Sequence, residues 1–138
     1  MSKSLPRAKV CIDVPFFDID AMNVVWHGHY VKYLEVARCE LLRSFDYDYP
    51  QMKESGFLWP IVDLRIKYVG SARFANKIWV EASLQEYENR LRIDYLITDA
   101  ASGDKLTKAT SIQVAVCADS GEMQYVSPAI LLEKLGLQ

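Results

Sequence analysis

The sequence predicts an α+β fold in which an antiparallel β-sheet wraps around one long helix. One stretch, residues 27–45, carries apolar side chains at helical spacing, and the later part of the chain alternates apolar and polar residues in several runs. Short turn signals separate these runs, and short links join neighbouring strands in antiparallel fashion. A helix with one apolar face needs one sheet face, which gives a layered arrangement of helix on sheet.

The first element expected is a strand over residues 8–16. Val10, Ile12 and Val14 alternate there with more polar neighbours. Pro15 marks the end of this strand or an edge position, because proline cannot donate a hydrogen bond to the ladder.

A loop over residues 17–26 is expected to lead into the long helix of residues 27–45. Gly28, close to the helix start, would allow another chain to approach closely. The helix face predicted to meet the sheet carries His27, Tyr30, Val31, Leu34, Arg38, Leu41 and Leu42.

After the helix the sequence predicts a turn or short helix over residues 47–56, which Gly56 ends. Four strands follow, separated by Asn, Asp, Ser and Gly turn signals, over residues 62–68, 78–85, 91–98 and 105–116. Ser127 and Pro128 are expected to cap a final short helix that ends at Gly136. Trp79 and Leu96 lie on the outer sheet face and favour an oligomer that covers them.

Composition favours one globular domain over residues 1–138. The net charge is −2 and no Lys/Arg block occurs, so nothing favours a nucleic-acid partner. The three cysteines are odd in number and form no CxxC motif, which favours a reducing, cytoplasmic location over a disulfide framework. No apolar leader segment and no run of roughly 20 apolar residues is visible, so we expect neither a signal peptide nor a membrane span.

The segment DIDAMNVVWHGHY, residues 18–30, holds both histidines of the chain and two aspartates. The first N–H groups of a helix have no partner within the helix and carry a partial positive charge, so this end could stabilise an oxyanion. Asp20 could turn back toward it and activate water or attack a carbonyl. His27 could polarise the substrate or orient the water.

Structural alternatives remain open for each of these residues. Asp18 and Asp20 could be loop carboxylates that cap or face solvent, and His27 could bond only to backbone. His29 is expected to be exposed. A metal site needs more ligands than an H-x-H pair supplies, and we expect none.

Glu35 and Arg38, three residues apart on the helix, are interpreted as an ion pair rather than as a catalytic carboxylate with its partner. Cys39 falls on the opposite helix face with no histidine base nearby, which argues against a thiol nucleophile.

At residues 18–38 the sequence resembles the 4-hydroxybenzoyl-CoA thioesterase-like acyl-CoA thioesterases. Their pattern D-x-D-x-x-x-x-V-x-[YW]-H-x-x-Y, followed by E-x-A-R, is present as DIDAMNVVWHGHY and EVAR. The segment YVGSAR, residues 68–73, is similar to the family's Y-x-x-P-A-R. The remaining strand order is compatible with the family at lower specificity.

This resemblance implies a hotdog fold, a five-stranded antiparallel sheet around a long central helix. It implies a homodimer, paired again into a homotetramer, with the active site between subunits, and a role in lipid metabolism. Asp20 would be the catalytic carboxylate and the backbone N–H of His27 would polarise the thioester carbonyl, without metal or cofactor. The residues expected to contact the acyl-CoA or acyl-carrier-protein substrate are Val25, Trp26, Gly28, Tyr30, Tyr68 and Arg73, of which Arg73 would meet the CoA phosphates.

Two departures from the family pattern stand near the site. Met22 and Asn23 replace small residues and could reshape the acyl entrance, and Ser71 replaces a proline that would stiffen its loop. Two alternatives to acyl-CoA hydrolysis are a hotdog dehydratase or hydratase and a non-catalytic acyl-thioester binder. The D-x-N-P-x-H spacing typical of the hydratases is absent, since Asp20 and His27 are seven residues apart.

Overall fold

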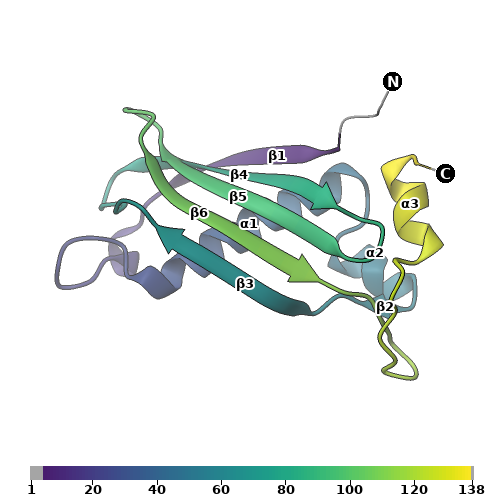
Figure 1. Cartoon of the computed structure of the whole chain (residues 1–138). Helices are drawn as coiled ribbons and strands as arrows, with labels where there is room; N and C mark the ends of the chain where they lie inside the picture. Colours follow the sequence, from purple (N-terminus) through teal and green to yellow (C-terminus); the bar gives the residue numbers. More distant parts are fainter. Residues whose placement is uncertain (1–4, 138) are drawn as a thin grey trace.

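A five-stranded antiparallel sheet holds the long helix α1 (Tyr30–Ser44) against one of its faces (Figure 1). The computed structural model describes residues 5–137. Strand order across the sheet is β1-β4-β5-β6-β3. The strands span Arg7–Asp13 (β1), Ile61–Tyr68 (β3), Lys77–Glu86 (β4), Leu91–Asp99 (β5) and Lys105–Gln113 (β6). The predicted hotdog fold is confirmed.

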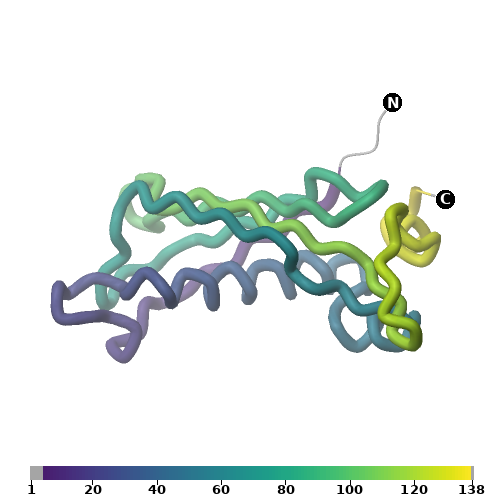
Figure 2. The backbone as a smooth tube through the Cα atoms, turned by 60° about the horizontal axis from the view of Figure 1, so that its bottom comes forward, coloured from purple at the N-terminus to yellow at the C-terminus, as the bar shows by residue number. Residues whose placement is uncertain are grey.

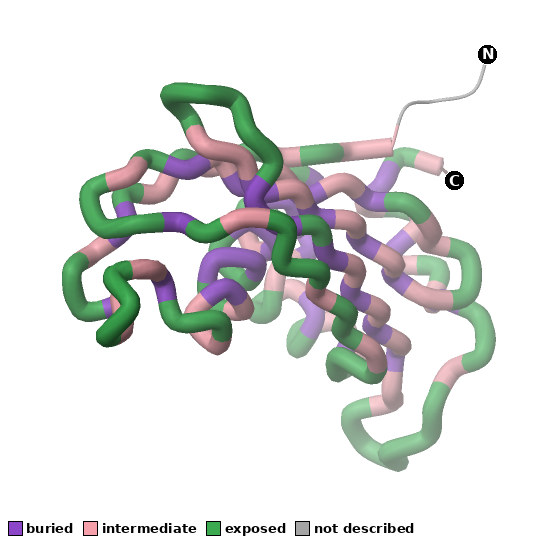
Figure 3. The backbone as a smooth tube through the Cα atoms, turned by 60° about the vertical axis from the view of Figure 1, so that its left-hand side comes forward, coloured by how far each residue is buried: buried purple, intermediate pink, exposed green. Residues whose placement is uncertain are grey.

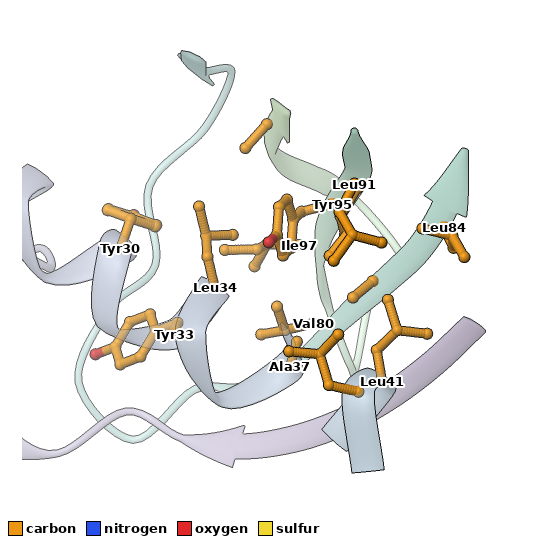
Figure 4. Close-up of a cluster of buried hydrophobic side chains, with 14 of the residues drawn as sticks. Tyr30, Tyr33, Leu34, Ala37, Leu41, Val80, Leu84, Leu91, Tyr95 and Ile97 are labelled. Atoms are coloured by element: carbon orange, nitrogen blue, oxygen red, sulfur yellow. The ribbon is translucent and has the colours of Figure 1, made fainter. Parts of the chain in front are cut away.

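The core lies between α1 and the central strands β4 and β5. Buried and partly buried residues alternate along these strands (Figure 3), as expected for strands with one face on a core. Leu34 and Leu41 point from the helix toward this sheet face (Figure 4). The inward residues of the two strands are Ile78, Val80, Ala82, Leu84, Leu91, Ile93, Tyr95 and Ile97.

The α-helix begins later than its sequence pattern predicts. Residues His27–His29 form a separate 3₁₀ turn, in which the Tyr30 N–H bonds the His27 carbonyl. Trp26 before it is extended, because its N–H bonds the Asp18 carbonyl across the loop at 3.0 Å. His27 is therefore exposed rather than turned toward the sheet, which corrects the prediction for this residue.

Within α1 the predicted apolar face is largely correct. Leu34, Leu41 and Leu42 are fully buried, and Arg38 is buried as expected. Val31 is only partly buried. Two further residues, Tyr33 and Ala37, belong to the buried face although the predicted set omitted them.

The strand boundaries differ from the prediction at two places. β1 ends at Asp13, before Pro15, and lies at an edge of the sheet. The last predicted strand is divided: β6 ends at Gln113, and β7 (Val116–Cys117) pairs instead with β2 (Phe57–Leu58). The division arises because the Ala115 carbonyl accepts a bond from the Gln124 N–H and so leaves the main sheet.

The two short helices match the predicted order. In α2 (Tyr49–Glu54), Asp48 and Gln51 form a capping box. α3 (Ala129–Leu135) ends at Gly136, whose φ of 72° is readily adopted by glycine. Ser127, however, does not cap α3: its hydroxyl is buried without a hydrogen-bond partner among residues 5–137.

Helix α1 packs on β1 and β4, so it runs along one side of the sheet (Figure 2). Strand β3 lies at the opposite edge, and its apolar residues Ile61, Val62 and Leu64 are exposed. None of the helices within residues 5–137 is long and apolar enough to cross a membrane. The prediction about a leader segment concerns the start of the chain, where residues 1–4 lie outside the described residues.

Candidate active site

The segment before α1 folds into a tight hairpin over residues 18–26, which projects beyond the end of the sheet (Figure 2). The Asp20 N–H donates to the Val24 carbonyl at 2.9 Å, and the Trp26 N–H donates to the Asp18 carbonyl at 3.0 Å. The chain therefore reverses direction between Asp20 and Val24, while the approach of the Asp20 carboxylate to the helix start stays a prediction. The hairpin places Asp20 opposite Val24, just before the turn that opens the helix.

Asn23 closes this hairpin with a φ of 66°, a left-handed conformation that Asn tolerates better than most residues. Asn23 thus supplies the backbone shape that a glycine would supply at this position. The Met22 N–H donates to Asp20 Oδ1 at 2.8 Å, while the Met22 side chain is 80 % exposed.

Asp20 is partly buried at the start of this turn. Its Oδ1 is occupied by the Met22 N–H. Within residues 5–137 no donor bonds the second oxygen, Oδ2. One carboxylate oxygen is therefore held in place while the other is available for chemistry.

Asp18 lies in a different environment, although it is only two residues away. Its side chain is 1 % exposed, and it accepts hydrogen bonds from Lys32 Nζ at 2.7 Å and Tyr33 Oη at 2.6 Å. Burial alone would raise the pKa of Asp18, but these bonds and the nearby charge of Lys32 hold it below its ordinary value. Asp18 is therefore a buried anion that is already fully engaged.

The hydrogen-bonding groups that His27 contributes to this site belong to its backbone rather than to its ring. Its carbonyl accepts a hydrogen bond from Tyr68 Oη at 2.9 Å, and its exposed ring lies beside Trp26. Among residues 5–137 no acceptor takes the N–H of His27 or Gly28. These two N–H groups are free to bind an oxyanion.

The Trp26 ring lies so close to residue 28 that only a glycine fits there. A Cβ at this position would lie 2.2 Å from the Trp26 ring. Within the chain the Trp26 indole occupies that space, and the approach of another chain to Gly28 stays a prediction. The indole also meets His29, which is partly buried, with Nδ1 3.8 Å from Asp18 Oδ1, and not exposed as expected.

The segment after β3 fastens this hairpin to the sheet. The Val25 N–H donates to the Ala72 carbonyl at 2.8 Å, and the Ala72 N–H donates to Tyr30 Oη at 3.0 Å. Burial raises the pKa of Tyr30, so its hydroxyl stays neutral. Val25 and Tyr30 were expected to contact substrate, yet both are buried here as structural members of the site wall.

Arg73 is exposed on the same segment, and its backbone forms an isolated bridge with Val24. Its guanidinium has no ion-pair partner in the described part of the chain, so it is available to an anion. The Arg73 N–H donates to Asn76 Oδ1, and Asn76 Nδ2 donates to Asp99 Oδ2, each at 3.0 Å. Asn76 thus stiffens the loop in which Ser71 replaces the family's proline.

Glu35 and Arg38 form the predicted i,i+3 ion pair, with 3.5 Å between Glu35 Oε1 and Arg38 Nη2. Glu35 is 58 % exposed and Arg38 is 4 % exposed. Arg38 also donates to Tyr49 Oη at 2.7 Å. Burial raises the pKa of the Cys39 thiol, which disfavours a thiolate nucleophile.

Exposed apolar side chains surround the hairpin. Phe16 and Phe74 stack edge to face with ring centroids 5.6 Å apart, and so join the loop to the segment that carries Arg73. Within residues 5–137, no group of three His, Cys, Asp or Glu side chains could hold a metal ion. The exposed apolar residues of this end are Phe16, Phe17, Met22, Trp26, Tyr68, Val69 and Phe74.

A sheet wrapped on one helix, with a carboxylate hairpin at the free N–H groups before that helix, is typical of hotdog-fold thioester hydrolases. The profile of the thioesterase-like superfamily matches residues 14–132. The chain belongs to this superfamily, and both the predicted family and the predicted class of enzyme are confirmed.

Individual relatives agree with this assignment. The chain is 29% identical over 110 residues to a putative acyl-CoA thioesterase of Bacillus subtilis, covering 79% of each chain. It is 30% identical over 124 residues to an acyl-CoA thioesterase of Haemophilus influenzae, covering 84% of each. A 1,4-dihydroxy-2-naphthoyl-CoA thioesterase from Synechocystis shares the fold at a TM-score of 0.83 and 19% identity, over 94% of this chain and 96% of that one.

Proposed function

We propose that this protein hydrolyses acyl-CoA thioesters, with Asp20 as the carboxylate that carries the reaction. The observation that supports this most is that one short hairpin carries Asp20, with a free carboxylate oxygen, and leads directly into the free N–H groups of His27 and Gly28. The two relatives named as acyl-CoA thioesterases support CoA as the thiol carrier.

In the general-base form of the reaction, Asp20 takes a proton from water as the water oxygen bonds to the acyl carbon. The N–H groups of His27 and Gly28 stabilise the oxyanion that forms. The carbon–sulfur bond then breaks, the acid is released and the thiolate leaves without needing a strong acid. In the nucleophilic form, the Asp20 carboxylate attacks the carbonyl carbon and the carbon–sulfur bond breaks, so that the thiolate leaves and a mixed anhydride remains. Water then hydrolyses the anhydride, which releases the acid and restores the Asp20 carboxylate.

The surroundings of this site fit the two ends of an acyl-CoA. Arg73 presents a free guanidinium, which suits a phosphate of CoA. The exposed ring of Trp26 lies beside the N–H groups and offers a surface for the apolar thioester. Tyr68 holds the His27 carbonyl and so orients the adjoining N–H groups.

The functional unit we propose is a homodimer, in which a second copy covers the edge strand β3 and completes the site. Ile61, Val62 and Leu64 on this strand are exposed, although they are large and apolar. An exposed apolar edge strand is a surface that pairs readily with another chain. Strand β3 begins three residues after β2 and ends at Tyr68, whose hydroxyl bonds the His27 carbonyl.

Replacement of the carboxylate tests the proposed function. We expect Asp20→Asn to lower thiol release from a panel of acyl-CoA substrates by about 10²- to 10⁴-fold, the usual range for loss of a general base. Thiol release is followed with DTNB, and circular dichroism verifies that the fold persists. Asp119→Asn, on the exposed turn after β7 at the opposite end of the molecule, is the matched control and should retain full activity (Figure 1).

Unchanged hydrolysis in Asp20→Asn would show that another group carries the reaction. The same panel, presented on acyl carrier protein, separates the two thiol carriers. Hydration of a crotonyl thioester without hydrolysis would instead identify a hydratase, and binding without thiol release would identify a non-catalytic binder.

A further inference from the structure

The buried carboxylate of Asp18 takes no part in the proposed chemistry, yet it is the best-satisfied anion of the hairpin. It is 1 % exposed and receives two short hydrogen bonds, from Lys32 at 2.7 Å and from Tyr33 at 2.6 Å. Burying a charge is costly unless it is paired and hydrogen-bonded. The fold therefore supplies a hydrogen-bond donor to each oxygen of this one carboxylate.

Asp18 connects three parts of the site at once. Its carboxylate bonds two residues in the first turn of α1, Lys32 and Tyr33. Its carbonyl accepts the Trp26 N–H at 3.0 Å. Trp26 directly precedes His27, whose N–H is one of the proposed oxyanion donors. The same hairpin strand continues from Asp18 to Asp20 within two residues.

The rings of Phe17 and Tyr33 lie beside the Lys32 ammonium group that bonds Asp18. Lys32 Nζ lies 5.7 Å from the Phe17 ring centroid and 5.5 Å from that of Tyr33. A hollow of about 340 Å³ lies beside Asp18, and the apolar residues Ile12, Pro15, Phe17 and Val36 line it together with the charged Asp13 and Lys32. In such surroundings a hydrogen bond to a charged group is stronger than in water.

We propose that Asp18 is a positioning residue, which locks the hairpin to α1 so that Asp20 and the N–H of His27 are held in reacting geometry. This inference rests on the proposed function for its catalytic consequence. Its structural part, the locking of the hairpin, stands on the contacts of Asp18 alone.

Hydrogen exchange of the backbone tests the locking without any substrate. In Asp18→Ala, which has no acceptor, we expect the hydrogen-bonded amides within residues 20–28 to exchange at least tenfold faster than in the unaltered protein. Asp18→Asn keeps one acceptor oxygen and should show an intermediate increase. Amides of β4 and β5 should be unchanged in both variants. Asp46→Asn is the matched control, since it removes the charge of a carboxylate that accepts a 2.7 Å bond from Lys134 at an exposed site.

Kinetics test the catalytic consequence. Misplacement of reacting groups by about 1 Å can cost 10²-fold in rate, so we expect kcat per folded molecule to fall about 10- to 100-fold in Asp18→Ala. KM for acyl-CoA should stay within about threefold, because the substrate-contacting residues remain. A purely structural role would lower the folded fraction and leave kcat per folded molecule unchanged. Asp18→Asn should recover part of the lost kcat.

Tyr33→Phe keeps the ring in the core and removes one of the two donors, so it serves if Asp18→Ala does not fold. It should show the same faster exchange over residues 20–28 and a smaller fall in kcat. Exchange that matches the unaltered protein in Asp18→Asn and Tyr33→Phe would overturn the inference. If the unaltered protein hydrolyses no acyl thioester, the proposed function fails, whereas the exchange result still decides whether Asp18 locks the hairpin.

Discussion

At the scale of single residues, the site depends on the backbone conformation of one residue and the missing side chain of another. Side-chain chemistry alone reveals neither. Asn23 adopts a φ of 66° to close the hairpin, and Gly28 leaves space for the Trp26 ring. Neither residue has a side chain that takes part in the proposed hydrolysis. Each permits the chain to pass from the carboxylate to the helix start within a few residues.

Gly28→Ala should lower both stability and activity. The added Cβ would lie 2.2 Å from the Trp26 ring, so the indole must move away from residue 28. Overpacking of this kind costs about 1–3 kcal/mol, which urea unfolding at pH 7 would measure. In Trp26→Ala/Gly28→Ala the clash is absent, so the glycine substitution should add little to the cost of Trp26→Ala. A full extra cost in the double variant would mean that the ring is not what Gly28 accommodates.

Asp18 should make the protein sensitive to acid. Its folded-state pKa is depressed, so its contribution to stability is present above the ordinary value of 3.8 and is lost as the pH falls through the folded value. The difference in unfolding free energy between the unaltered protein and Asp18→Asn should therefore shrink below about pH 4. Urea titrations at several pH values would measure it. A difference that stays constant down to pH 2 would contradict the depressed pKa.

At the scale of the elements, helix α1 was predictable and its start was not. The 3.6-residue period of Leu34, Arg38 and Leu41 identifies the buried face. The period also runs through His27, but hairpin bonds hold Trp26 extended and delay the α-helix to Tyr30. Local helix propensity cannot predict a hydrogen bond from Trp26 to a residue eight positions earlier.

Leu41→Ala should destabilise the protein by about 2–5 kcal/mol, because it leaves a cavity between the helix and the sheet. Leu41 is fully buried in the core (Figure 4). Val36→Ala on the exposed side of the same helix is the matched control and should cost less than about 1 kcal/mol. Equal costs from urea unfolding would contradict the assigned helix faces.

At the scale of the whole molecule, the sheet is covered unequally. Helix α1 packs on β1 and β4, and β3 at the far edge exposes apolar residues. The sequence pattern hinted at an uncovered surface through Trp79 and Leu96 on the outer face, yet both are partly buried. The larger exposed apolar surface lies on the edge strand, which periodicity could not identify because strand order is a long-range property.

Leu64→Lys should weaken the proposed dimer, because a charge on an edge strand opposes pairing with a second chain. Light scattering would then show a monomer where the unaltered protein gives at least a dimer. Cys11→Lys, an exposed position on the other edge strand β1, is the matched control and should not change the mass. A monomeric unaltered protein that is fully active would refute a site completed by a second copy.

The sequence by itself determined the α+β class, the buried face of the helix and the family, because each depends on local periodicity or on the D-x-D…H motif. It also separated Asp20 from Asp18, but only through the family resemblance. The tertiary structure decided what each residue touches. It buried Asp18, whose carboxylate bonds Lys32 and Tyr33. It paired the hydroxyls of Tyr30 and Tyr68 with backbone amide and carbonyl groups around the hairpin, and it left the His27 ring in solvent. These contacts join residues 14 to 42 positions apart in the chain, and such pairings follow from packing rather than from the order of the amino acids.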